Sequence, residues 1–202
     1  MIKPVKKLML VALLSALGSA GAMAAEQSHF EHFITRDGAT LKDGDKVFRF
    51  AGIHAPELHR IEDDARGTCK ADSRGWGQYF RWPTAEEQEN WIKALVQTGA
   101  RAQRVYVLSV QQTFDEACGR ETHILAPETA DGMPRLNEKA MRVYDNMIAE
   151  ADKQGLRLIL PFIDHWWWWG GREQLAAFYH EKPEDFYRTD SKTFKAYLDV
   201  IR

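Results

Sequence analysis

The sequence predicts an α/β fold built on a parallel sheet. Three near-continuous apolar runs, at residues 47–53, 102–110 and 156–163, recur about every 54 residues, and each precedes a long polar segment and an amphipathic helical pattern. Parallel strands covered on both faces are apolar throughout, and alternation of strand and helix favours right-handed βαβ units. We therefore expect three such units in order along the chain.

The composition of the chain is that of an ordinary globular protein. It has 202 residues, of which 45% are hydrophobic and 28% are charged, so a disordered or collagen-like chain is excluded. Lys and Arg number 27 against 29 Asp and Glu, which gives a formal net charge of -2. Because no basic field is present, we expect no nucleic-acid partner.

Residues 1–24 are predicted to be a secretory signal peptide. Three lysines precede the apolar segment 8–17, and small residues at 22–24 provide a cleavage site. A membrane anchor is the alternative, but the apolar segment is well short of the roughly 20 residues that a spanning helix needs. We expect the mature chain, residues 25–202, to be secreted or periplasmic and to have no membrane partner after cleavage.

Cys69 and Cys118 are the only cysteines of the chain. In an oxidising compartment they could form one disulfide, and two free thiols are the alternative, because the sequence does not fix their separation. Neither a CxxC pair nor a neighbouring histidine set indicates zinc. We therefore expect no metal and no cofactor.

The first apolar run follows a predicted hairpin, and two of the helices have clear start and stop signals. Asp37-Gly38 and Asp43-Gly44 are turn signals for a small hairpin at one end of the fold. Thr84 and Glu87 form a capping box before a stripe that ends at Gly99.

A second helix is predicted from a cap at Asn137 to a stop at Gly155. A third begins near Asp190 or Ser191, and its apolar stripe still continues at Arg202 without a stop signal.

Function is expected in the segments that follow the strands. Residues 54–83, 111–136 and 164–189 are long, whereas the joins from helix to strand are only a few residues. Ligands of parallel α/β folds bind at the carboxyl ends of the strands. Any site should therefore be built from these three loops.

Four consecutive tryptophans, Trp166 to Trp169, follow the third apolar run. Neither strand nor helix periodicity turns four adjacent side chains to one side, so at least one or two should be exposed. Exposed aromatic rings mark binding surfaces, and an indole face matches the C–H face of a sugar ring. Packing against neighbouring loops is the alternative, which is stronger for Trp167 and Trp168. We predict that Trp166 and Trp169 stack on sugars.

Arg104 lies inside the second apolar run. A guanidinium in a buried strand needs a partner, and the natural one is a carboxylate at the mouth of the fold. We predict that Arg104 orients an active-site carboxylate and keeps it ionised by lowering its pKa. A structural ion pair with a local acid is the alternative.

The remaining polar candidates are histidines and one glutamate. His54, His59 and His165 follow predicted strands and could donate to sugar hydroxyls or to a carboxylate, and a structural role is the alternative for each. Glu57 is a weaker candidate for a catalytic acid, because no second carboxylate is evident as its partner.

These segments resemble glycoside hydrolase family 5, in particular its endo-β-mannanase-like branch. The resemblance rests on residues 48–54, on residues 99–106 with their arginine, and on residues 155–171 with Trp166 and the Trp-Gly-Gly sequence. It covers residues 33–202 in order. Members of the family usually have the sequence Asn-Asn-Trp where this chain has Asp-His-Trp at residues 164–166. The roles of the two asparagines in binding sugar therefore do not transfer directly to Asp164 and His165.

The resemblance implies a (β/α)8 TIM barrel, of which only the first three βα units are present in this chain. It also implies retaining hydrolysis of O-glycosyl bonds in a β-linked polysaccharide such as β-mannan or β-glucan. That chemistry uses two carboxyl groups about 5 to 5.5 Å apart. In the family these glutamates follow the fourth and seventh strands, so neither is expected in this chain.

We therefore expect the chain to be the exported N-terminal part of a secreted glycosidase, inactive by itself and a monomer when complete. A polysaccharide or oligosaccharide is its expected partner. The mature chain is also short of the roughly 250 residues of a typical barrel. The leading alternative is a complete, non-catalytic carbohydrate-binding protein that uses the loop from Trp166 to Trp169. A different barrel enzyme, such as a lyase or isomerase, is a third possibility and would depend on a metal.

Overall fold

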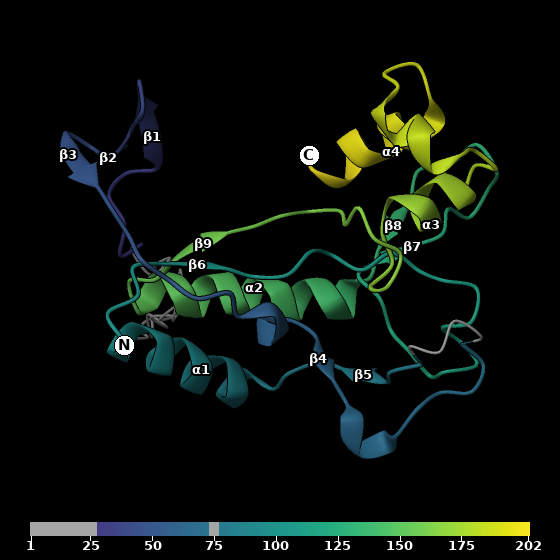
Figure 1. Cartoon of the computed structure of the whole chain (residues 1–202), viewed down its shortest axis with the longest axis horizontal. Helices are drawn as coiled ribbons and strands as arrows, with labels where there is room; N and C mark the ends of the chain where they lie inside the picture. The colour runs from purple at the N-terminus through teal and green to yellow at the C-terminus, as the bar shows by residue number, and fades with distance from the viewer. Residues whose placement is uncertain (1–27, 73–76) are drawn as a thin grey trace, which may run out of the picture.

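The computed structural model describes residues 28–72 and 77–202, and its fold is α/β. The predicted signal peptide lies outside the described residues. Within these two ranges, no helix combines the length and the apolar character needed to cross a membrane. Figure 1 shows a long helix beneath two extended segments, with a hairpin at one end and a group of short helices at the other.

The predicted hairpin forms a three-stranded antiparallel sheet, β1 (Ile34–Asp37), β2 (Thr40–Asp43) and β3 (Lys46–Phe48). Gly38 and Gly44 occupy its two turns with φ of 58° and 57°, a left-handed conformation that glycine adopts without steric cost. The hairpin prediction is confirmed.

The second and third apolar runs form the predicted parallel pair. Strand β6 (Ala102–Arg104) pairs with β9 (Arg157–Ile159), and Arg104 lies opposite Ile159. Beyond this short ladder the two segments stay together, because the backbone N–H of Leu108 donates to the carbonyl of Phe162 at 2.9 Å.

The first apolar run is not a strand of the parallel sheet, and that prediction is wrong. Its start belongs to β3, and residues 49–53 have no ladder. The run still lies beside β6, since a Cβ on Gly52 would collide with the carbonyl oxygen of Ala102. Ile53 is 63% exposed, so no layer of the described residues covers its outer face. The described chain therefore contains no closed barrel.

The helices begin at the predicted caps. Thr84 and Glu87 form the capping box of α1 (Ala85–Gln97), and Asn137 accepts a hydrogen bond from the backbone N–H of Lys139 at the start of α2 (Glu138–Lys153). Both helices lie on the same side of β6 and β9, with α2 directly beneath the strands (Figure 1). The core between helices and strands contains these buried side chains: Ile92, Leu95, Val105, Leu108, Tyr144, Met147 and Leu156.

The remaining elements are short and lie in the loops. After β9 come α3 (Arg172–Ala177), the 3-10 helix η3 (Pro183–Tyr187) and α4 (Lys192–Val200), which pack together. Ser191 accepts a hydrogen bond from the backbone N–H of Phe194, so α4, which is the third helix that the sequence predicts, starts at one of its two predicted caps. The two other loops contain the following pieces: η1 (Pro56–Leu58), β4 (Ile61–Glu62), η2 (Asp64–Arg66), β5 (Phe80–Arg81), β7 (Ile124–Leu125) and β8 (Arg135–Leu136).

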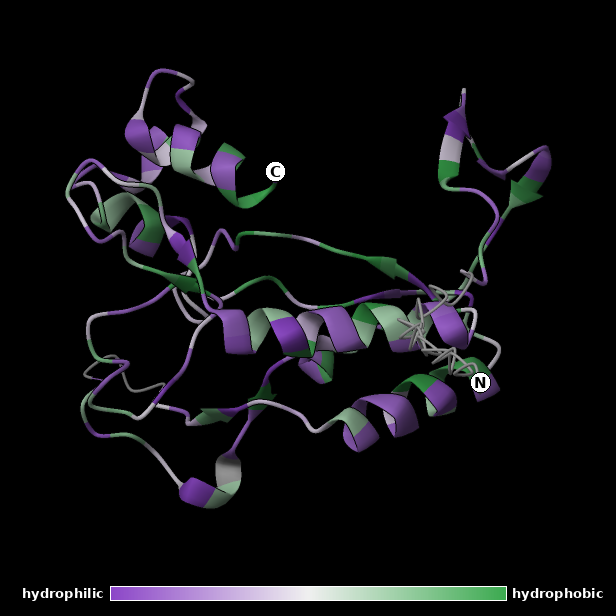
Figure 2. Cartoon of the chain, turned by 180° about the vertical axis from the view of Figure 1, so that it is seen from behind, coloured by the Kyte–Doolittle hydropathy of each residue, from purple (hydrophilic) through white to green (hydrophobic). Residues whose placement is uncertain are grey.

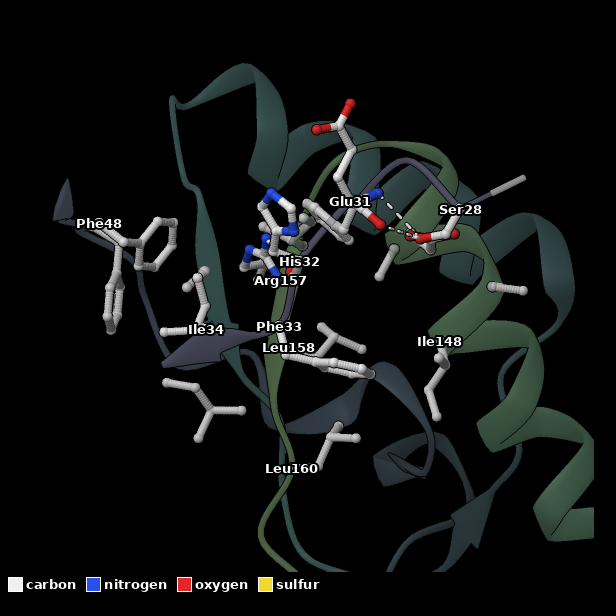
Figure 3. Close-up of a pocket in the computed structure, with 18 of the residues that line it drawn as sticks. Ser28, Glu31, His32, Phe33, Ile34, Phe48, Ile148, Arg157, Leu158 and Leu160 are labelled. Atoms are coloured by element: carbon white, nitrogen blue, oxygen red, sulfur yellow. Dashed lines mark hydrogen bonds between the residues drawn. The ribbon is translucent and has the colours of Figure 1, made fainter. Parts of the chain in front are cut away.

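An apolar groove of about 720 Å³ lies at the amino end of β9, between the hairpin and the outer face of α2. Figure 3 shows Phe33 and Ile148 facing it together with side chains of β9 and the residues that follow. Seen from behind in Figure 2, β9 is hydrophobic after its first residue, Arg157, while the helices alternate between hydrophobic and hydrophilic residues. Arg157 anchors the hairpin at this end through hydrogen bonds of 2.9 Å to the carbonyl of His32 and to the Asp43 carboxylate.

A disulfide between Cys69 and Cys118 joins the first long loop to the second, with a Cα–Cα distance of 5.6 Å. Both cysteines are buried beside Arg120, whose guanidinium pairs with Asp72 at 3.5 Å and with Asp115 at 3.8 Å. The disulfide and the buried ion pair between Arg120 and Asp72 hold the same two loops together at one place, whereas the pair between Arg120 and Asp115 lies within the second loop.

Replacing both cysteines with serine is expected to lower the free energy of unfolding by about 4 kcal/mol. The bond closes a loop of 49 residues, and its loss lets the unfolded chain gain the corresponding entropy. Urea denaturation measures the change, and the reduced wild-type protein should match the double variant. Two titratable thiols in the denatured, unreduced protein would contradict the bond.

Candidate functional site

The site lies where β6 and β9 end, on the face of the strands opposite the helices. Side chains alternate along a strand, so Arg104 and Tyr106 share one face while Val105 points to the other. Val105 is fully buried in the core with the helices, whereas Arg104 is exposed. Figure 1 shows that this end of the strands is the one that leads into α3, away from the hairpin.

Arg104 binds His54 from the segment beside it. The Nδ1 of His54 lies 2.9 Å from the carbonyl oxygen of Arg104, and its Nε2 lies 3.2 Å from Nη1 of the same residue. A carbonyl only accepts and a guanidinium only donates, so Nδ1 carries the imidazole proton. His54 is therefore oriented as a neutral acceptor for Arg104.

Arg104 is not buried, contrary to the prediction, and the local ion pair that was the alternative is not found among the described residues. No carboxylate in the described ranges forms an ion pair with it. The open face of the parallel pair explains this difference, because solvent reaches the guanidinium and removes the need for a buried counter-ion. Its predicted support of an active-site carboxylate stays a prediction.

Tyr106 and Asp164 form the second polar contact of the site. The hydroxyl of Tyr106 donates to Oδ2 of Asp164 at 2.8 Å. Burial raises the pKa of Tyr106 well above its usual value, and the hydrogen bond to Asp164 adds to the shift, so the phenol stays protonated. The other carboxylate oxygen accepts the backbone N–H of Trp166 at 3.2 Å, so Asp164 also fixes the start of the tryptophan loop.

The tryptophan loop, residues 164–171, turns its rings in different directions. Trp166 is 66% exposed, as expected for at least one ring of this run, but Trp169 is 1% exposed and its indole N–H donates to the carbonyl of Val107 at 2.9 Å. The loop returns to the second strand segment, where the backbone N–H of Val110 donates to the carbonyl of Gly170. This bond turns Trp169 inward, so its predicted role in sugar stacking is wrong.

Arg60 holds Trp169 from the opposite loop, and the sequence did not identify it as a functional residue. Its guanidinium lies 3.9 Å from the ring centroid of Phe80 and 4.8 Å from that of Trp169. Burial lowers the pKa of Arg60 to about 9, and the nearby charge of Asp115 opposes that shift. The cation is stabilised by the faces of the two aromatic rings, an interaction that gains strength away from water.

His59 is buried and cannot donate to a substrate, so of the two roles considered for it the structural one holds. Its Nε2 lies 2.9 Å from the carbonyl of Tyr106, and its Nδ1 lies 2.9 Å from Nε2 of His123. Because the carbonyl only accepts, Nε2 of His59 carries a proton and Nδ1 accepts from His123. Nδ1 of His123 in turn accepts the backbone N–H of Ser109. No periodic sequence signal surrounds His123, so nothing in the sequence pattern points to it as a functional residue.

The other predicted residues have simpler positions. His165 is exposed beside Trp166, with its ring centroid 5.1 Å from the Trp166 ring. Glu57 accepts the backbone N–H of Glu62 at 2.9 Å, which ties the first loop to itself. In the part of the chain that the structure describes, no three histidine, cysteine or acidic side chains are placed to hold a metal ion.

Solved structures with a similar fold include endo-1,4-β-mannanases and a glycoside hydrolase family 5 mannosidase. The endo-1,4-β-mannanase from Rhizomucor miehei matches with a TM-score of 0.62 and 14% identity, over 84% of this chain and 40% of that protein. The family 5 mannosidase from the same organism matches with a TM-score of 0.54 and 18% identity, over 87% of this chain and 43% of that protein. The endo-1,4-β-D-mannanase from Thermotoga petrophila matches with a TM-score of 0.53 and 16% identity, over 76% of this chain and 37% of that protein.

The chain therefore has the fold of part of a family 5 type barrel. It spans about two fifths of the length of these solved proteins. No family model matches the sequence. No curated protein matches it either.

Replacing Trp169 with alanine is expected to lower the free energy of unfolding by about 3 to 5 kcal/mol, because it removes a buried indole and leaves a cavity. The same substitution at Trp166 should change it by less than about 0.5 kcal/mol, because that ring is mostly in solvent. Urea denaturation of both variants gives the two values. Equal losses would contradict the placement of Trp169 in the core.

Acid is expected to destabilise the protein through the buried histidine pair. Burial lowers the folded-state pKa of His59 from 6.5 to about 4, so between these values the unfolded chain binds a proton that the folded chain does not. Stability should therefore be greatest above pH 6.5 and fall as the pH drops toward 4, by roughly 3 kcal/mol for this group. Burial also lowers the pKa of His123 well below its usual value, which acts in the same direction.

The measurement is the free energy of unfolding from urea denaturation at about pH 7, 6 and 5. In a variant with His59→Gln and His123→Gln, the free energy of unfolding should change less with pH than in the wild type. The control His29→Gln, at an exposed histidine, should keep the wild-type dependence on pH. If the double variant loses as much stability between pH 7 and 5 as the wild type does, the buried histidine pair does not cause the acid destabilisation.

Proposed function

We propose that this chain forms part of the substrate cleft of a secreted or periplasmic glycosidase. Its substrate would be a β-linked polysaccharide or oligosaccharide, such as β-mannan or β-glucan, cleaved with retention. The observation that carries the proposal is the placement of Arg104, Tyr106, Asp164 and Trp166 at the carboxyl ends of β6 and β9. In barrels of this type the loops at that end form the active site.

Each of these side chains has a role that follows from its contacts. Trp166 offers an exposed indole face for the C–H face of a sugar ring. Arg104 has a guanidinium that is bonded to His54 and otherwise reaches solvent, so it can orient a carboxylate supplied by another part of the barrel. Asp164 keeps the loop in place through Tyr106 and the backbone of Trp166.

The proposal assigns binding, and not bond cleavage, to the residues of this chain. Retaining hydrolysis needs a nucleophile and an acid/base, two carboxyl groups about 5 to 5.5 Å apart. Both oxygens of Asp164 already accept hydrogen bonds, and Glu57 is engaged with the backbone of its own loop. Without the pair, sugar binding alone cannot supply the proton and the nucleophile together.

Export is supported by the disulfide, because such bonds persist in oxidising compartments. We propose that the complete protein acts as a monomer. A second candidate is a carbohydrate-binding protein without catalysis, favoured by the 66% exposure of Trp166. The two candidates differ in whether sugar bonds are broken in the complete protein and agree on the binding role of this chain.

The chain is expected to be retarded during electrophoresis in gels that contain mannan, and Trp166→Ala should abolish the retardation. Cellulose and xylan gels give the comparison among backbones. Trp91→Ala is the matched control, because Trp91 is an exposed tryptophan on α1 and should leave the retardation unchanged. Reducing-end assays on mannan should detect no product.

Migration that is the same in all gels and in their sugar-free controls would overturn the proposed binding. Release of reducing ends by the purified chain would overturn the assignment of binding without cleavage.

A further inference from the structure

Arg172, the first residue of α3, connects the tryptophan loop to η3. Its Nε donates to the carbonyl of His165 at 3.3 Å, and its Nη1 donates to the carbonyl of Pro183 at 3.3 Å. Its guanidinium carbon also lies 5.3 Å from the ring centroid of Tyr187. One side chain therefore fixes two segments that are about twenty residues apart in the sequence.

The proton positions in this cluster follow from which atoms can donate. Nη2 of Arg172 lies 3.3 Å from Nε2 of His165, and a guanidinium has no acceptor, so Nε2 accepts. In the neutral imidazole the proton then sits on Nδ1, which lies 3.2 Å from the hydroxyl oxygen of Tyr187. His165 donates to that oxygen. The hydroxyl hydrogen of Tyr187 is not used in this bond and can be donated to a ligand.

The cluster is exposed to solvent on its aromatic side. Trp166 is 66% exposed and Tyr187 is 59% exposed, with the imidazole of His165 in contact with both. Contiguous exposed aromatic rings on a soluble protein mark a binding surface. These rings are interrupted by a hydroxyl and an imidazole, so the surface suits a ligand that alternates apolar C–H faces with hydroxyl groups, as a sugar chain does.

We propose that Tyr187 and His165 form a sugar subsite next to Trp166, and that Arg172 is its positioning residue. Tyr187 contributes its ring face and its hydroxyl as a donor to a sugar oxygen. Arg172 does not touch the sugar and acts by holding His165 and η3 so that Tyr187 faces outward. The ligand class, a β-linked hexopyranose chain, rests on the proposed function.

Calorimetric titration of the full chain with mannohexaose, and with cellohexaose in parallel, tests this subsite. Tyr187→Phe removes only the hydroxyl and should weaken binding about 3- to 10-fold, the effect of one hydrogen bond. Tyr187→Ala also removes the ring and should weaken binding further. Tyr79→Phe is the matched control, since Tyr79 lies in the first loop and should leave the affinity unchanged.

The positioning role is tested by a double-mutant cycle. Arg172→Met should weaken mannohexaose binding in the wild-type background and have little further effect in the Tyr187→Ala background, because Arg172 acts by positioning the ring and the hydroxyl that this variant removes. Arg172→Lys should not restore binding, since an ammonium cannot make the three contacts of the guanidinium. Thermal melting of every variant shows whether it is folded, and only a loss of affinity at unchanged melting temperature supports the role.

Wild-type affinity in both Tyr187 variants, with binding lost in Trp166→Ala, would overturn the subsite and leave the proposed function standing. Additive effects of Arg172→Met and Tyr187→Ala would overturn the positioning role. Failure of the wild-type chain to bind either hexasaccharide would overturn the proposed function and the subsite with it.

Discussion

The parallel pairing of β6 with β9 determines which side chains can form the site. With Arg104 opposite Ile159, alternate residues of β6 face the helices or the open side of the sheet. Tyr106 continues the open side and Val105 enters the core. If the pairing of β6 with β9 shifted by one residue, the Arg104 guanidinium would be buried and the Val105 side chain would be exposed. The free-energy cost of burying that charge therefore fixes the register.

All three long loops contribute to a layer beneath the exposed residues. Arg60 and Phe80 come from the first loop, the disulfide joins that loop to the second, and Trp169 comes from the third. A buried cation between two aromatic rings is held by their faces and by nearby charge. The surface that carries Trp166 is therefore supported by loop-to-loop contacts as well as by the strands, which span only three paired residues each.

Local features of the sequence predicted local structure well. The caps at Thr84 and Asn137 lie where the helices start, because a cap bonds to backbone groups two or three residues away. The failures concern residues whose position depends on distant partners. The apolar run 47–53 lacks a covering layer. Trp169 is turned inward by a bond between its loop and the second strand segment, and His59 is buried by a histidine from the second loop. The periodic pattern of apolar residues along the chain does not indicate which distant residues will contact one another.

The groove between the hairpin and α2 has a practical consequence. Phe33 is 91% exposed beside Ile148, in a hollow of about 720 Å³. Dyes such as ANS fluoresce on exposed apolar surface, and their binding is ordinarily taken as a sign of a loosely packed state. This chain would bind such a dye while natively folded. Dye fluorescence would then overstate its denaturation, and circular dichroism in the near ultraviolet would be the sounder measure of its tertiary packing.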